Sequence, residues 1–317
     1  MHRFSYFTFL ILILLVPSVL AQNSRAATAA SYVERGNHWY ALREWERAIA
    51  DYNLAIASDP NSANAYINRG ITRGAKKDLE GAMADFNRVI ELEPRLAEAY
   101  VNRGLLWQLK GDWDAMISDQ TKAIELNPRL AQAWGSRGFA RLQKGDLDEA
   151  LEDLNRALKL NPRLVDAWNN RGIIKQLKQD LSGALSDFTE AIKRDPQFAA
   201  AFSNRGATRQ LKGDLDDALA DHEQALKLQP EADTYFNRAT AWRAKGERGR
   251  ALTDFNQAIE LNPRFAKAYA NRGLLLLLQG KDEEAQGDFA RCVELDPSLK
   301  PELEWCINEL KRVLATK

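Results

Sequence analysis

An arginine and an aspartate recur together along the chain, always sixteen residues apart, and they are the residues best suited to chemistry. A guanidinium and a carboxylate can form two parallel hydrogen bonds, whereas an arginine without a carboxylate can bind an anion. Because every arginine has its aspartate, the pattern favours structural ion pairs that join two segments over a ladder of anion-binding arginines. The eight pairs are Arg35 with Asp51, Arg69 with Asp85, Arg103 with Asp119, Arg137 with Asp153, Arg171 with Asp187, Arg205 with Asp221, Arg238 with Asp254 and Arg272 with Asp288.

An asparagine stands directly before most of these arginines and is the second candidate. Asparagine is a mediocre helix former, so its repetition inside a helix indicates a task. Its amide both donates and accepts a hydrogen bond, the combination that a peptide backbone requires. The position predicts either a ladder that binds a peptide or a set of bonds to neighbouring helices and water. Its members are Asn68, Asn102, Asn170, Asn204, Asn237 and Asn271, with Glu34 and Ser136 in the other two copies.

Apolar residues one position before or three positions after this asparagine position share its helix face. They predict a groove with apolar patches between the amide groups, which suits an extended or a helical peptide. Packing against the adjacent copy is the alternative for part of the set. The groove residues are Ile67, Ile71, Val101, Leu105, Phe139, Ile173, Phe236 and Leu274.

The elements that must position these residues follow from regularly spaced prolines. They are Pro60, Pro94, Pro128, Pro162, Pro196, Pro230, Pro263 and Pro297, 34 residues apart except for a gap of 33 before Pro263. Each copy indicates two helices. An aromatic residue and a small residue four positions later share a face of the first helix, as at Tyr66 and Gly70. The second helix carries small, large and small residues, as at Ala82, Phe86 and Val89, before the proline ends it.

Some copies depart from this pattern. Met116 and Gln120 replace the small and aromatic residues of the third copy, and His222 replaces the aromatic residue of the sixth, so we expect these copies to pack less tightly. Most copies also have a turn in which a glycine suits a left-handed helix end and an aspartate can cap the next helix. Such turns are Gly111 with Asp112, Gly145 with Asp146, and Gly213 with Asp214.

This order of aromatic, glycine, small, aromatic, small and proline residues at a 34-residue period resembles the tetratricopeptide repeat family over residues 29–299. The resemblance implies an all-α, right-handed α-solenoid of eight helix-turn-helix repeats with a concave inner face. In several peptide-binding members an asparagine ladder at this position lines the concave face, which implies the same role for the six asparagines. Residues 300–317 are predicted to form a capping helix and tail, because a solenoid needs a cover for its last apolar face.

The N-terminus has the pattern of a secretory signal peptide over residues 1–21. Arg3 provides a positive start, a mostly apolar run follows, and Val19 and Ala21 offer small residues for cleavage after Ala21. An uncleaved membrane anchor is the alternative, although the run is near the lower length limit for crossing a bilayer. We therefore expect an exported protein, periplasmic or secreted, with a short polar lead-in over residues 22–28.

Composition argues against several other classes of protein. Lys and Arg number 44 and Asp and Glu number 44, so the chain lacks the basic excess that nucleic-acid binding requires. Two cysteines and three histidines are too few and too scattered for a metal site. No catalytic cluster or phosphate-binding loop occurs, so we expect no enzyme activity and no cofactor. Cys292 and Cys306 should pack near each other, either as free thiols or, since export permits it, as a disulfide.

The sequence thus predicts an exported scaffold that binds a partner peptide or protein segment on its concave face. The alternative is a structural or self-associating spacer that uses the convex face or the array ends. The residues before the ladder positions are not basic, which disfavours the lysine-rich clamp that some tetratricopeptide domains use for a carboxyl terminus. We expect no nucleic-acid partner, and no membrane contact in the mature form unless the N-terminal segment is retained.

Overall fold

The computed structural model describes residues 24–315, and within that range the chain forms helices joined by turns, without a β-strand. It divides into two compact units that meet inside helix α9, between Asn170 and Arg171. The predicted signal peptide over residues 1–21 lies outside the described residues. The first helix begins at Ser24, so most of the predicted lead-in over residues 22–28 is helical, because its alanines and arginine are good helix formers.

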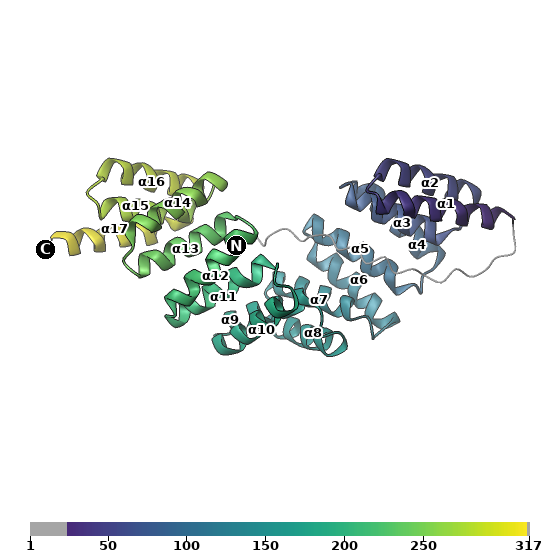
Figure 1. Ribbon diagram of the computed structural model, residues 1–317, viewed down its shortest axis with the longest axis horizontal. Coiled ribbons are helices and arrows are strands. Elements are labelled where there is room, and N and C mark those ends of the chain that lie inside the picture. Colours follow the sequence, from purple (N-terminus) through teal and green to yellow (C-terminus); the bar gives the residue numbers. More distant parts are fainter. Residues whose placement is uncertain (1–23, 316–317) are drawn as a thin grey trace. The chain divides into compact units, whose positions relative to one another are not determined.

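The first unit contains four helical hairpins within the described residues, and the start of α9 (Figure 1). In each hairpin the two helices pack along each other. The hairpins are α1 (Ser24–Ala41) with α2 (Trp45–Ser58), α3 (Ala63–Ala75) with α4 (Leu79–Leu92), α5 (Ala97–Lys110) with α6 (Trp113–Leu126), and α7 (Ala131–Lys144) with α8 (Leu147–Leu160).

The second unit continues the same alternation, beginning within α9, and ends with one additional helix. Its elements are α9 (Val165–Leu177) with α10 (Leu181–Arg194), α11 (Ala199–Lys212) with α12 (Leu215–Leu228), α13 (Ala232–Ala244) with α14 (Arg248–Leu261), α15 (Ala266–Leu277) with α16 (Asp282–Leu295), the short 3-10 helix η1 (Pro297–Leu299), and α17 (Lys300–Ala315). The described part of the chain therefore has the predicted all-α organisation of eight repeats followed by a terminal helix.

A glycine in the first helix and a large side chain in the second let each hairpin close tightly. A Cβ atom added at Gly70 would lie 3.1 Å from the ring of Phe86, and one added at Gly172 would lie 2.7 Å from the ring of Phe188. Side chains in protein interiors are close-packed, so a larger residue would push the two helices apart. The predicted pairing of a small residue with an aromatic one is thus the contact that joins the two helices.

The third and sixth repeats keep this packing with a polar side chain in place of the aromatic one. Gln120 is completely buried and donates to the carbonyl of Val101 at 3.2 Å, but its Oε1 atom has no partner among residues 24–315. His222 is also completely buried, and neither ring nitrogen has a partner in the same range. Met116 packs fully buried against Phe139. The predicted looser packing is therefore wrong; the cost of these departures is unpaired polar atoms.

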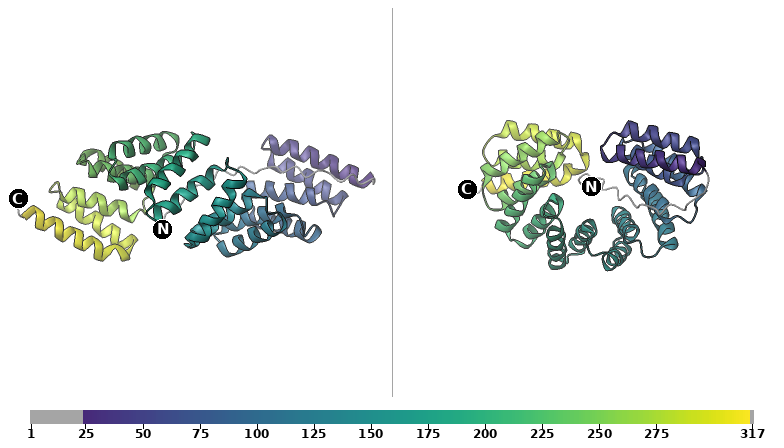
Figure 2. Two further views of the ribbon diagram at one scale, coloured as in Figure 1. Left: turned by 90° about the horizontal axis from the view of Figure 1, so that it is seen from below. Right: turned by 45° about the vertical axis from the view of Figure 1, so that its right-hand side comes forward.

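Successive first helices lie against one another, whereas successive second helices make no comparable contact within the described residues. In the first unit α1 contacts α3, α3 contacts α5, and α5 contacts α7, while in the second unit α11 contacts α13. Most second helices instead contact the first helix of their own hairpin and that of the next hairpin (Figure 2). The first helices are therefore the more closely spaced layer within each unit.

The turn inside each hairpin places one residue in the left-handed region. Gly111, Gly145 and Gly213 adopt φ angles of 73°, 87° and 88°, as predicted. In the first, second and fifth repeats the corresponding residues are not glycine: they are Arg43, Lys77 and Gln179, with φ angles of 60°, 65° and 65°. A side chain in this region clashes with its own backbone, so these three turns are strained.

The aspartate that follows this residue caps the next helix in only some hairpins. Asp112 accepts a hydrogen bond from the backbone N–H of Ala115 at 3.0 Å, whereas Asp146 and Asp214 accept none. The cap prediction is thus right for Asp112 and wrong for the other two. Their helices carry acidic residues at the second and third positions, and these repel a carboxylate at the cap.

The turn between hairpins depends on the residue before the proline. Asn127 accepts a bond from the backbone N–H of Arg129 at 3.1 Å, which closes a tight turn around the proline. The proline carbonyl then accepts a bond from the aromatic residue that opens the next helix, as from Trp134 Nε1 to Pro128 at 3.0 Å. Equivalent turns form at Asp59, Asn161, Asp195, Asn262 and Asp296.

Helix α17 covers the apolar end of the last hairpin, as predicted for a cap. Leu303, Ile307 and Leu310 recur on one face of the helix, and they belong to the same apolar cluster as Phe289 and Cys292 of α16. Leu303 is almost completely buried there. The last repeat therefore does not expose the face that an additional repeat would cover.

Candidate binding surface

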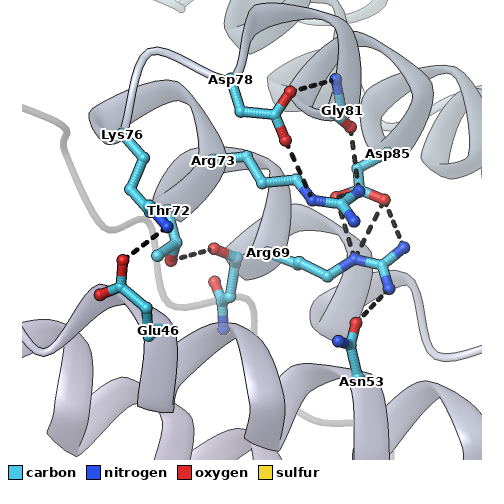
Figure 3. Close-up of polar contacts among 10 residues, drawn as sticks. Glu46, Asn53, Arg69, Thr72, Arg73, Lys76, Asp78, Gly81 and Asp85 are labelled. Atoms are coloured by element: carbon cyan, nitrogen blue, oxygen red, sulfur yellow. Dashed lines mark hydrogen bonds and ion pairs between the residues drawn. The ribbon is translucent and has the colours of Figure 1, made fainter.

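Every predicted arginine–aspartate pair is present, and each lies within one hairpin. Nε and Nη2 of Arg69 on α3 donate to the two carboxylate oxygens of Asp85 on α4 at 3.0 and 2.6 Å (Figure 3). The other seven pairs have the same two contacts, at 2.6 to 2.9 Å. The aspartates are buried, so each carboxylate depends on its partner. Hydrogen bonding from Arg35 accordingly lowers the pKa of Asp51.

Several of these arginines also bind the preceding hairpin. Nη1 of Arg69 donates to Asn53 on α2 at 2.6 Å (Figure 3), and the guanidinium lies over the ring of Tyr66, 5.3 Å from its centroid. Equivalent bonds join Arg103 to Asn87, Arg137 to Thr121, Arg205 to Thr189 and Arg272 to Asn256. Such an arginine fixes three helices relative to one another. Its donors are used inside the protein, which argues against the anion-binding ladder.

A second donor reaches most of the buried carboxylates from one turn further along the first helix. Arg73 Nη1 donates to Asp85 at 2.8 Å (Figure 3), and Trp107 Nε1 donates to Asp119 at 3.0 Å. Trp39, Arg141, Lys175 and Arg209 play the same part in their own repeats. The pairs are therefore small buried networks in which most carboxylates have several donors.

A further set of ion pairs between hairpins was not predicted. Lys76 at the end of α3 pairs with Glu46 on α2 at 2.6 Å (Figure 3), and Lys110 pairs with Glu80 at the same distance. The same pairing joins Lys144 to Asp114 and Lys245 to Asp216. A lysine seven residues after the repeated arginine, with an acidic residue 29 or 30 positions earlier, was the available signal.

The six asparagines are not equally available to a ligand. Asn68 donates to Asn37 of the preceding first helix at 2.9 Å. Asn271 accepts from Arg243 at 2.6 Å and donates to a backbone carbonyl of its own helix at 2.8 Å. Asn170 is only 5% exposed. At these three positions the alternative interpretation, bonding or burial inside the protein, fits better than a binding role.

The remaining asparagines are more open. Asn102 on α5 and Asn237 on α13 are half-buried, and their side-chain amides have no hydrogen-bond partner within residues 24–315. Asn204 on α11 is also half-buried, and it is engaged by a contact within the protein. Each unit thus offers one amide that can donate to and accept from a ligand backbone.

Most of the predicted groove residues are core residues. Ile67 and Ile71 lie in the apolar cluster between the second and third repeats, and Val101 and Phe139 lie in two other clusters. Ile173 is buried as well. Leu105, Phe236 and Leu274 remain half-buried, and Phe236 stacks on Phe255 and Phe265. The groove prediction is therefore wrong for the five buried residues, because the neighbouring hairpin covers that side of the helix.

An exposed row of leucines replaces the predicted groove. Leu109, Leu177 and Leu211 are 48%, 54% and 63% exposed. Each stands seven residues after a ladder asparagine, which is two helical turns and therefore nearly the same face. We call this side of the first helices the asparagine face; Leu109 lies on that of the first unit, and Leu177 and Leu211 on that of the second. A search seven residues beyond each asparagine would have found them.

The balanced charge of the chain is divided unevenly between the two kinds of helix. In the second unit, α11, α13 and α15 together carry seven basic residues and a single acidic residue, Asp233. The second helices carry the aspartates that neutralise the repeated arginines. Lys212, Arg243 and Lys267 have no carboxylate partner within residues 24–315, so the asparagine face of this unit has a positive bias.

The described residues contain no group of three or more His, Cys, Asp and Glu side chains arranged to bind a metal ion. Cys292 and Cys306 are both free thiols: Cys292 is buried in the terminal cluster, where burial raises its pKa, and Cys306 is partly exposed near Arg243. The disulfide alternative is thus absent from the structure. Among the helices from Ser24 onward, none combines the length and apolar character of a membrane span.

The fold and this surface define an all-α protein built from stacked helical hairpins. A family model described as TPR repeat matches residues 138–179 and 239–280. Two models described as tetratricopeptide repeat match residues 33–94 and, for the other model, residues 97–130 and 266–299. Together these ranges cover more than half of the sequence, and the chain belongs to the tetratricopeptide repeat family. No curated protein sequence matches it.

Solved structures share the fold at low sequence identity. A chain of the APC/C hetero-tetramer Cut9–Hcn1 aligns with a TM-score of 0.69 and 17% identity over 85% of this chain and 52% of its own. This chain therefore spans about half the length of that one. A tetratricopeptide repeat protein from Parabacteroides merdae aligns at 0.62 and 18% identity, over 79% and 99% of the two chains. Pseudomonas aeruginosa pilF aligns at 0.62 and 17%, over 70% and 100%.

Proposed function

We propose that the protein is an exported scaffold that binds a segment of a partner protein on its asparagine faces. The tetratricopeptide repeat fold itself implies a protein or peptide partner. The leucine row of the second unit is the observation that carries the choice of surface: Leu177 and Leu211 are 54% and 63% exposed beside the ladder positions of α9 and α11. Large apolar side chains aligned on one surface are typical of interaction sites.

The energies indicate that the leucines contribute more than the asparagines. Fully burying one leucine side chain is worth roughly 1.5–3 kcal/mol, whereas a net hydrogen bond is worth about 1 kcal/mol. Micromolar binding requires about 8 kcal/mol after the cost of association. Within each unit the open amide, Asn102 or Asn237, therefore orients a backbone, and the exposed leucines supply most of the affinity.

Substitution of the leucine row tests this proposal in the second unit. Leu177→Ser combined with Leu211→Ser should abolish capture of the partner from the exported fraction, because the apolar contact is lost while the hairpins remain packed. Leu261→Ser is the matched control, since Leu261 is 50% exposed but lies at the end of the second helix α14. Equal capture by the double variant and the wild type would rule out this surface.

Export rests on the signal-peptide pattern of residues 1–21 and is tested separately. Cell fractionation followed by N-terminal sequencing should find the protein outside the cytoplasm with Gln22 as its first residue. A full-length chain in the cytoplasmic fraction would contradict export. That result would leave the binding surface unaffected, because the leucine row does not depend on location.

A further inference from the structure

A groove lies at the C-terminal end of the second unit, between α15, the first helix of the last hairpin, and the capping helix α17. It has a volume of about 280 Å³. We call it the terminal groove. Its lining includes Arg243 of α13, Leu274 of α15, Leu278 directly after α15, and Trp305, Glu309 and Val313 of α17.

The capping function of α17 does not account for Trp305 and Val313. The cap uses Leu303, Ile307 and Leu310, which pack into the apolar cluster of the last repeat. Trp305 and Val313 stay 68% and 43% exposed. A tryptophan left mostly in water on a helix that already has a complete packing face marks a contact surface.

Arg243 is the unusual polar group of this groove. Arginines one residue earlier in the repeat, such as Arg73 and Arg209, donate to buried aspartates. Arg243 donates to the amide oxygen of Asn271 at 2.6 Å, and no carboxylate lies within ion-pair distance of it in residues 24–315. Glu309, across the groove, is paired with Arg312 at 2.7 Å.

We propose that the terminal groove binds an acidic residue flanked by a large apolar residue, within a partner segment that follows the asparagine face. This inference rests on the proposed function and specifies its ligand. The carboxylate accepts hydrogen bonds from the Arg243 guanidinium, and the apolar neighbour packs on Trp305 and Leu278. Bonds between a guanidinium and a carboxylate are stronger than those between neutral groups, so this contact gives specificity as well as affinity.

Two further observations support an acidic ligand. Arg243 is exposed although it lines the groove, so its charge is accessible to a ligand, and partial desolvation lowers the pKa of Arg243. The neighbouring first helices add Lys212 and Lys267 without a carboxylate partner in the described residues. Leu278 also stands seven residues after Asn271, in the same register as Leu211, although Ala244 takes this position on the intervening helix α13.

Selection from a phage-displayed library of random peptides on the purified protein tests the proposal. Enriched peptides should contain Asp or Glu beside Leu, Phe or Trp. Arg243→Gln should weaken binding of a synthetic copy at least about tenfold, the effect of losing one hydrogen bond to a charged group. Arg243→Glu should select basic residues in place of acidic ones. Lys193→Gln removes an equal charge from an exposed position on the second helix α10 and should leave the affinity unchanged.

The location of the bound peptide is tested with the two thiols. Cys306 lines the groove and is partly exposed, whereas Cys292 is buried. A bound peptide should slow alkylation of Cys306 several-fold in intact-mass measurements, while Cys292 stays unmodified and reports that the protein is folded. An unchanged alkylation rate at saturating peptide would place the ligand elsewhere and overturn the proposal.

The remaining outcomes separate this inference from the proposed function. Peptides without acidic residues, or equal effects of Arg243→Gln and Lys193→Gln, would overturn the proposed role of the terminal groove. If Leu177→Ser with Leu211→Ser still abolished binding of those peptides, the asparagine face would stand without it. A dimer that Trp305→Ala dissociates in sedimentation would show that a second copy fills the groove, and would also overturn the proposal. So would a selection that enriches no peptide.

Discussion

The buried histidine of the sixth repeat makes stability depend on pH. Burial lowers the pKa of His222 to about 4 from its ordinary value of 6.5. Between these values the unfolded chain binds a proton that the folded chain does not, so stability increases with pH in this range. The folded state is therefore fully stable with respect to this group above about pH 6.5 and loses stability as the pH falls toward 4.

His222→Phe should remove this dependence, because phenylalanine fills the aromatic position without a titratable group. The difference in melting temperature between the variant and the wild type should grow as the pH is lowered from 7 to 5. The underlying difference in the free energy of unfolding changes by at most about 1.4 kcal/mol per pH unit. Circular dichroism melts across that range measure it, with His38→Phe at an exposed position as the control. A difference that stays constant with pH would contradict the assignment.

Two glycines of the eighth repeat, Gly273 and Gly287, should respond in opposite directions to substitution by alanine. A Cβ atom at Gly273 would lie 2.5 Å from the ring of Phe289, so Gly273→Ala should destabilise the protein by about 1–3 kcal/mol. Gly287 lies in helix α16 with nothing within 4 Å of an added Cβ, so Gly287→Ala should stabilise it by up to about 1 kcal/mol. Urea unfolding of both variants checks the signs. Similar values for the two would contradict the close approach of the helices.

At the scale of the hairpin, backbone strain is found in the three turns that have a residue with a side chain in the left-handed region. Lys77 adopts a φ of 65°, a conformation that costs a residue with a side chain about 1–2 kcal/mol. Lys77→Gly should therefore stabilise the second repeat, by roughly 0.5–1 kcal/mol after the greater freedom of glycine in the unfolded chain is subtracted. Urea unfolding measures the effect. Lys122→Gly, at an exposed position inside helix α6, should be destabilising instead, and stabilisation by both variants would refute the argument.

Hairpins were more predictable from the sequence than their open faces. Gly70 and Phe86 report a contact inside one hairpin, and the same spacing recurs in most of the eight copies, so helix boundaries and pairing follow from the repeat. The ion pair between Arg69 and Asp85 was predictable for the same reason. Ile67 and Leu109 show the limit: helical periodicity identifies a face, but only the position of the next hairpin decides which part of that face is covered.

Over the whole molecule, the first and the second helices of the hairpins carry different kinds of side chain. The second helices carry the eight buried aspartates that pair with the repeated arginines and most of the acidic charge, whereas the first helices carry the repeated arginines, the open amides and the exposed leucines. Most of the repeated arginines bind two or more partners inside the protein, so their side chains join neighbouring helices and fix the register between them. The asparagine faces are thus the surfaces that packing leaves with an aligned apolar and amide pattern.

A photoreactive amino acid placed at position 211 or at position 261 tests this account most directly. Both native leucines are more than 45% exposed, but Leu211 lies on the asparagine face and Leu261 on a second helix. Irradiation with the captured partner present should cross-link the partner to position 211 and not to position 261. A cross-link from position 261 with none from position 211 would contradict the assignment of the binding surface.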